Sequence, residues 1–169
     1  MGFETQAVRG VLNHYGVRTT DSKFGGIQGK EVLKSVSIEF TAPSNGIAAA
    51  AWAKTALDVV IPVGAVFLSA DVIVETAFDA LTGLTIGTYA ATDGTTAIDA
   101  DGLVTAAACT LEMINAVGDR VLGAGAQLAT GTAGLGALTS AAVIRVLYTG
   151  TAPTVGKARL LVQYAMPTA

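Results

Sequence analysis

Few side chains in this sequence could perform chemistry, and they do not stand in catalytic patterns. His14 is the only histidine and Cys109 the only cysteine, whereas a nucleophilic triad needs a positioned base and a zinc centre needs several such ligands. The glycine-rich segment 131–139 lacks the Lys and Ser/Thr that follow the last glycine of a phosphate loop, and Gly123-Ala124-Gly125 lacks the third glycine of a dinucleotide fingerprint. The inventory predicts no enzyme, no cofactor and no metal site, and it argues against a hydrolase.

The acidic residues leave one alternative open, a site for a hard cation. Asp93-Gly94 and the stretch 99–102 (Asp-Ala-Asp-Gly) are similar to fragments of calcium loops, where closely spaced carboxylates surround the ion. A full loop pattern would need Asp or Asn at position 103 and Gly at position 104, where Leu103 and Val104 stand. Asp-Gly pairs form turns because Asp bonds its local backbone and Gly accepts positive φ. We therefore expect turns here, with cation binding as the alternative.

The composition indicates a protein whose surface is partly covered by other proteins. Hydrophobic residues make up 51% of the 169 residues and charged residues only 14%, against roughly 25% charged in an average soluble domain. A monomer of this kind would expose apolar patches, which self-association or docking on a larger assembly would cover. The net charge of −3 argues against nucleic acid as a partner. The most apolar window, 47–66, is too interrupted by charge and proline to span a membrane.

The N-terminal segment differs from the rest of the chain. Residues 1–29 carry scattered bases and no sustained alternation, so we predict an extended N-terminal arm at 1–29 and a β-domain at 30–169. Arms of this kind are ordered by a partner; the alternative is that the arm packs on its own domain. From Thr55 to Asp119 there are nine acids and no base, which we interpret as a solvated outer face. The candidate partner contacts in the arm are Phe3, Arg9, Leu12, His14, Tyr15, Arg18, Lys23 and Phe24.

Alternating apolar and polar residues predict strands from position 31 onward. The segment 66–75 is a strong strand in which Leu68 alternates with Phe67 and shares a face with Val72. Residues 89–103 are rich in Asp, Gly and Thr and are expected to form a long loop. Seven or eight strands with long connections predict an all-β protein, a jelly-roll-like antiparallel β-sandwich in preference to an up-and-down barrel. The further expected strands cover 31–40, 55–61, 84–88 and parts of 120–130.

Two alternating segments near the end, 142–148 and 157–164, flank a Gly/Pro/Thr connection, and this pattern predicts a β-hairpin. One face of the second segment carries Ala158, Leu160, Val162 and Tyr164 and is expected to close the core. The opposite face of the hairpin is expected to carry basic side chains and to form a second contact surface, or an ordinary solvated face. The candidate residues of this second surface are Trp52, Arg145, Lys157 and Arg159.

The β-region resembles the head decoration, or cement, proteins of short-tailed bacteriophages. The resemblance covers about residues 30–165 and rests on the stretches 57–65 (LDVVIPVGA), 72–79 (VIVETAFD), 84–88 (LTIGT) and 99–103 (DADGL) and on the two closing segments. It implies a non-enzymatic virion protein, made in the host cytoplasm. It further implies a homotrimer on the outer capsid surface, with the arm reaching the major capsid protein and the sandwich clamping capsid subunits. A phage tail or fibre component, or a receptor- or glycan-binding β-module, is the alternative function.

Overall fold

The computed structural model describes residues 33–42, 47–48, 59–128 and 136–166. The predicted arm at 1–29, with its eight candidate contact residues, lies outside the described residues, and so does Trp52. The described strands belong to one compact unit that begins at Leu33. No helix among the described residues is long and apolar enough to cross a membrane.

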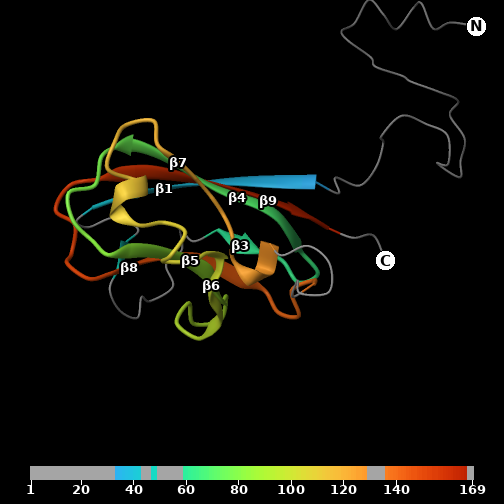
Figure 1. The fold of residues 1–169 in the computed structure, drawn as a ribbon. Coiled ribbons are helices and arrows are strands. Elements are labelled where there is room, and N and C mark those ends of the chain that lie inside the picture. Colours follow the sequence, from blue (N-terminus) through green and yellow to red (C-terminus); the bar gives the residue numbers. More distant parts are fainter. Residues whose placement is uncertain (1–32, 43–46, 49–58, 129–135, 167–169) are drawn as a thin grey trace, which may run out of the picture. The chain divides into compact units, whose positions relative to one another are not determined.

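Two β-sheets form the two layers of this unit (Figure 1). Sheet A has the strand order β1-β9-β4-β7, and sheet B has the order β2-β8-β5-β6, with β3 also pairing with β8. All strand pairs are antiparallel except the short pair of β2 with β8. The strands are β1 (Leu33–Thr41), β2 (Ile47–Ala48), β3 (Val60–Ile61), β4 (Val66–Thr76), β5 (Gly83–Ala90), β6 (Ala97–Val104), β7 (Arg120–Leu122), β8 (Ala142–Thr149) and β9 (Lys157–Ala165). Two short 3₁₀ turns, η2 (Leu111–Met113) and η3 (Ala126–Leu128), lie between strands.

The strand pairing is nested around the connection between β5 and β6. Outward from that connection, β5 pairs with β6, β4 with β7, β2 and β3 with β8, and β1 with β9. This long folded ribbon then rolls up, so that β9 also pairs with β4 and β8 with β5. Nested pairing followed by rolling is the topology of a jelly roll. The predicted fold class, an all-β jelly-roll-like sandwich, is therefore confirmed for the described residues.

The core lies between the sheets and follows the alternation of the strands. On β9 the residues of the predicted inward face, Ala158, Leu160, Val162 and Tyr164, are buried. Lys157 and Gln163 of the opposite face remain accessible. Cys109 is also buried, as its apolar neighbours predict, and burial raises the pKa of its thiol to about 12. The sulfur is therefore a packing group rather than a nucleophile.

The predicted hairpin of the two closing segments is wrong. β8 lies in sheet B and β9 in sheet A, so the connection 150–156 crosses from one layer to the other. Asp79 holds this connection, because its carboxylate accepts hydrogen bonds from the backbone N–H groups of Thr154 (2.8 Å) and Val155 (3.2 Å) and from the Thr154 hydroxyl. The glycines and proline mark a change of direction, but they do not specify the neighbouring strand.

Two further expectations differ from the structure. Part of the expected loop at 89–103 is strand β6. Its pairing with β5 is irregular, because the two-residue step from Ile86 to Thr88 on β5 lies opposite a five-residue step between Val104 and Asp99 on β6. In β4, a β-bulge between Phe67 and Ser69 shifts the alternation by one residue. Phe67 therefore enters the core, at 5% exposure, and Leu68 points outward, at 51% exposure.

Candidate functional site: the ionic cluster on sheet A

Among the described residues, the outer face of sheet A carries a dense group of charged side chains that form ion pairs with one another. We call Glu39, Glu75, Lys157 and Arg159 the ionic cluster. Glu39 and Arg159 lie directly opposite each other in the β1–β9 pair, and Lys157 is paired with Thr41 of the same ladder. Glu75 comes from β4, on the other side of β9. The cluster therefore spans three neighbouring strands.

The four members of the ionic cluster are connected by short contacts. The Lys157 ammonium lies 2.9 Å from a Glu75 carboxylate oxygen and 3.1 Å from Glu39. Arg159 donates from Nε to Glu75 at 2.9 Å, and its terminal nitrogen lies 3.4 Å from Glu39. Each base thus contacts both acids, and the cluster carries no net formal charge.

A β-bulge positions Glu75 within the cluster. The register of β4 against β9 shifts between Val74 and Thr76, so Glu75 is the additional residue on β4 at this point. A bulge re-aims the side chain that it carries. Here the Glu75 carboxylate reaches both Lys157 and Arg159, which lie two residues apart on β9.

The electrostatics of the cluster favour the charged forms. Hydrogen bonds from Lys157 and then Arg159 lower the pKa of Glu75 below its ordinary value. Hydrogen bonds to Glu75 and Glu39 raise the pKa of Lys157. Both groups are solvent-accessible, where ion pairs contribute little to stability because water and salt screen them. The arrangement suits a polar contact surface, and the pKa shifts of Glu75 and Lys157 both favour the charged forms of these two groups.

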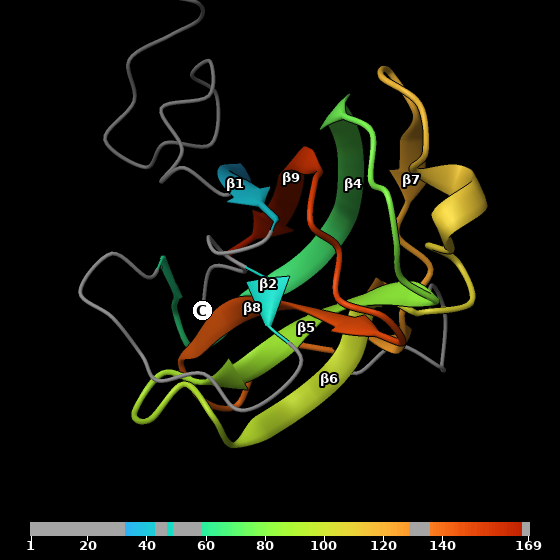
Figure 2. The same cartoon turned by 90° about the vertical axis from the view of Figure 1, so that its left-hand side faces the viewer.

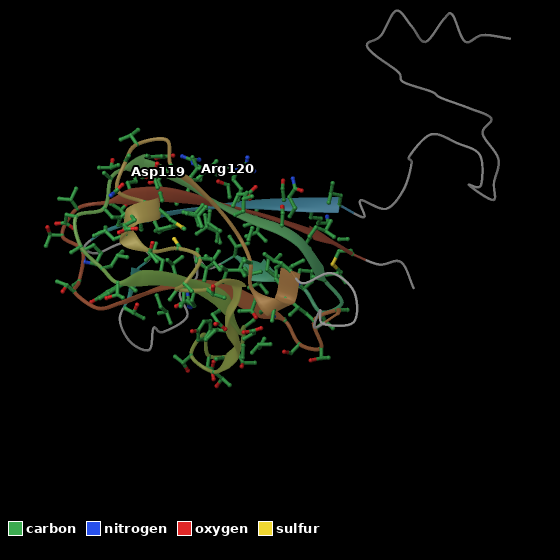
Figure 3. The ribbon with its side chains drawn as sticks, in the orientation of Figure 1. Asp119 and Arg120 are labelled. Atoms are coloured by element: carbon green, nitrogen blue, oxygen red, sulfur yellow. The ribbon has the colours of Figure 1, made fainter. Side chains whose placement is uncertain are left out.

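A second ion pair extends the charged face toward β7. Arg120 donates to Asp71 of β4 at 3.0 Å, and it lies on the side of sheet A that faces away from sheet B (Figure 3). Asp119, the preceding residue, instead accepts the backbone N–H of Ala116 at 2.8 Å and closes the turn before β7. The outer face of sheet A thus holds ion pairs on both sides of β4.

The structure brings together only two residues of the predicted second contact surface. Lys157 and Arg159 lie together in the ionic cluster. Arg145 does not join them, which corrects the expectation of a shared basic face. It lies on β8 in sheet B, is only 3% exposed, and its Nε lies 3.4 Å from the carbonyl oxygen of Gly94. The cause is the crossing connection, which separates β8 and β9 into different layers.

The sequence prediction named Lys157 and Arg159 but missed their acidic partners Glu39 and Glu75. Alternation along β1 and β4 does place Glu39 and Glu75 opposite the apolar face, so that signal was available. Their proximity to β9 follows from strand order, which no local pattern contains. The same holds for Asp71 and Arg120, which are 49 residues apart in the chain.

The acidic segments considered for cation binding have different surroundings. Asp93 forms the expected turn and accepts backbone N–H groups from Thr95 (2.8 Å) and Thr96 (3.0 Å). Asp99 and Asp101 lie on β6 rather than in a loop; partial burial and then the neighbouring Asp101 raise the pKa of Asp99. Among the described residues no three His, Cys, Asp or Glu side chains are grouped as a metal site would require.

In comparisons with known proteins, this chain is similar to chains of two solved phage capsid structures. No family model matches the chain, and no curated protein matches it. Among solved structures, a chain of the capsid of Ralstonia phage GP4 is similar at 15% identity, with 80% of this chain and 86% of that chain covered and a TM-score of 0.48. A chain of the cyanophage Pam1 capsid asymmetric unit is similar at 20% identity, with 80% and 84% covered and a TM-score of 0.44.

Proposed function

We propose that this chain is a non-enzymatic structural protein of a tailed-phage virion, which binds the outside of the capsid and clamps its subunits. In this proposal it is made in the host cytoplasm, associates as a homotrimer and contacts the major capsid protein through residues 1–29. The observation that carries the proposal is the jelly-roll sandwich, because it is the fold implied by the sequence resemblance to phage decoration proteins.

The chemistry of the described residues supports a contact role. The ionic cluster is internally paired and accessible, and the only described thiol is buried with a raised pKa. Such a surface gains from burying area and from placing charges against complementary charges.

Capsid binding by a repeated protein does not require strong single contacts. Apolar burial contributes about 25 cal/mol per Å², so modest patches give modest affinity. A homo-oligomer that engages several capsid subunits at once multiplies these contributions through effective concentration. The low charge content of the chain, 14%, is consistent with a surface that is mostly covered in the particle.

The experiment is co-sedimentation with capsids that lack this protein. We expect a variant without residues 1–29 to retain the thermal transition of the β-domain and to lose capsid attachment. A matched variant, Lys157→Ala with Arg159→Ala, removes the basic half of the ionic cluster and keeps the arm, and it tests the second contact surface separately. Normal attachment of the truncated protein would overturn the role of the arm. Failure of the full-length chain to bind any capsid, together with saturable binding to host cells or glycans, would favour the tail-fibre or glycan-binding alternative.

A further inference from the structure

The edge strand β1 is long and regular. It pairs with β9 through nine consecutive residue pairs, from Leu33 with Ala165 to Thr41 with Lys157, with no register shift. Among the described residues β1 has no strand on its other side, and it stands at the end of the row β1-β9-β4-β7 (Figure 2). About half of its backbone N–H and C=O groups therefore point away from β9. Such an edge is a template for another strand.

As far as the described residues show, the opposite edge of sheet A is protected in a way that β1 is not. β7 has only three residues, and the adjoining chain bonds to the backbone of β4 on both sides of it. Gly118 donates to the carbonyl of Val74 at 2.9 Å, and Gly123 donates to the carbonyl of Ala70 at 2.6 Å. Short strands and irregular chain segments of this kind prevent edge-to-edge pairing. β1 has neither proline nor bulge, and Lys34, near its start, is its only inward-facing charge.

The core is incompletely closed beside β1. Val36 and Ile38 point toward the core, but both are only partly buried. Their direct partners on β9, Val162 and Leu160, are fully buried. Within the described ranges, sheet B offers only β2 and β3 at this side, each two residues long. A neighbour at this edge would therefore cover apolar surface as well as satisfy backbone groups.

We propose that β1 pairs antiparallel with β1 of a second copy of this chain, across a two-fold axis at Ser37, and joins two A sheets into one continuous sheet. A register centred on Ser37 is the one that pairs all nine residues of the strand, because Leu33 then lies opposite Thr41 of the second copy. Self-pairing of one surface patch is the usual form of a two-fold interface. The strand sequence is suited to it on both faces.

On the inner face of the joined sheet, Val36 of each copy lies opposite Ile38 of the other. The two half-buried residues thus cover each other, and β-branched pairs are favourable across strands. On the outer face, Ser37 meets Ser37 and Glu39 meets Ser35, so no like charges are opposed. A slip by one residue would place Val36 opposite Ser37 and turn the two sandwiches to opposite faces of the sheet. The apolar residues would then remain exposed, which disfavours that register.

The two-fold contact uses the outer edge of β1. It makes a dimer of single chains or, in a trimer whose three-fold contact lies elsewhere, links two trimers in pairs. The proposal holds whether or not the protein binds a capsid, because it depends only on β1.

The test is disulfide trapping of the full-length chain carrying Ser37→Cys. Ser37 is exposed, and the native Cys109 is buried, so the new thiol is the reactive one among the described residues. Directly opposed residues in an antiparallel pair have Cα atoms about 4.5–5.5 Å apart, which lies within the range of Cα separations that a disulfide bridges. We expect Ser37→Cys to form covalent dimer under mild oxidation, read on a non-reducing gel. Thermal melting of the reduced variant checks that it folds.

The matched control is Ser35→Cys, which is also exposed, on the same face of the same strand. In the proposed register its two copies are four residues apart along the strands, about 14 Å, which is beyond the reach of a disulfide. We expect at least about tenfold less covalent dimer than with Ser37→Cys. Equal trapping at both positions would indicate random collision and overturn the proposal, as would no trapping at position 37. Efficient trapping only in a mixture of the Ser35→Cys and Ser37→Cys proteins would also overturn it, because it would place the axis at Val36.

Discussion

The bulge at the start of β4 can be tested by truncating two adjacent residues. Phe67 is 5% exposed and packs edge-to-face against Tyr164, with ring centroids 6.4 Å apart. Replacing a buried Phe by Ala leaves a cavity and costs about 3–5 kcal/mol. Leu68 is 51% exposed, so Leu68→Ala removes only about half of the contribution of a buried leucine, roughly 1 kcal/mol or less. The structure therefore predicts a large difference between neighbours in the sequence.

The assay is thermal and urea unfolding of the two variants and the parent, followed by circular dichroism. For a chain of this size each kcal/mol shifts Tm by about 2–4 °C, so Phe67→Ala is expected to lower Tm by roughly 10 °C and Leu68→Ala by less than about 4 °C. Strict alternation along β4, as the sequence predicted it, places Leu68 on the face of the buried Val72. A larger loss for Leu68→Ala than for Phe67→Ala would refute the bulge and the register of β4 against β9.

Three further predictions address single positions. Gly87→Ala is expected to lower the free energy of urea unfolding by more than about 2 kcal/mol, because a Cβ there would lie 2.1 Å from the carbonyl oxygen of Asp99. The control Gly64→Ala, at positive φ in open space, is expected to lower it by only about 1–2 kcal/mol. An equal loss for both variants would contradict the close approach of β5 and β6. Hydrogen bonds, first from the Thr96 side chain, lower the pKa of Asp93 to about 2, below the unfolded value of about 3.9. The stabilisation by Asp93 is therefore complete above about pH 4 and is lost as pH falls toward 2, so the Tm difference between the parent and Asp93→Asn should shrink over that range, and a constant difference would contradict it. Because burial raises the pKa of Cys109 to about 12, its reaction with a thiol reagent at pH 8 should be at least about a thousandfold slower in the native than in the urea-unfolded protein; fast native labelling would show that the thiol is accessible.

The sequence allowed the strands with clear alternation to be predicted. β9 and the second half of β4 have one buried and one accessible face at the expected positions, and β1 has a partly buried face opposite an exposed one. Burial in a sandwich imposes a period of two on the sequence, so the local pattern is sufficient there. It failed at Leu68 because a bulge changes the phase without changing the residue types. It failed at β6 because Asp99 and Gly102 are turn-forming residues that here belong to an irregular strand.

The candidate site was less predictable because it depends on strand order. Lys157 and Arg159 could be identified as an outward pair on one strand, but Glu39 and Glu75 become their partners only because β9 lies between β1 and β4. Arg145 was placed wrongly for the same reason. Turn residues between β8 and β9 are compatible with a hairpin and with a crossing between layers, and the pairing of β8 with β5 decides between them.

The nested pairing has a consequence for synthesis on the ribosome. β9 is the last of the described strands in the chain, and it lies in the interior of sheet A with β1 on one side and β4 on the other. Until Lys157–Ala165 has left the exit tunnel, β1 has no neighbour in its own sheet and the ladder that joins it to β4 is missing. Closure over such long sequence separations is slow. The inner faces of β1 and β4 therefore remain without β9 between them until late in synthesis. When β9 emerges, it completes both ladders and this part of the core together.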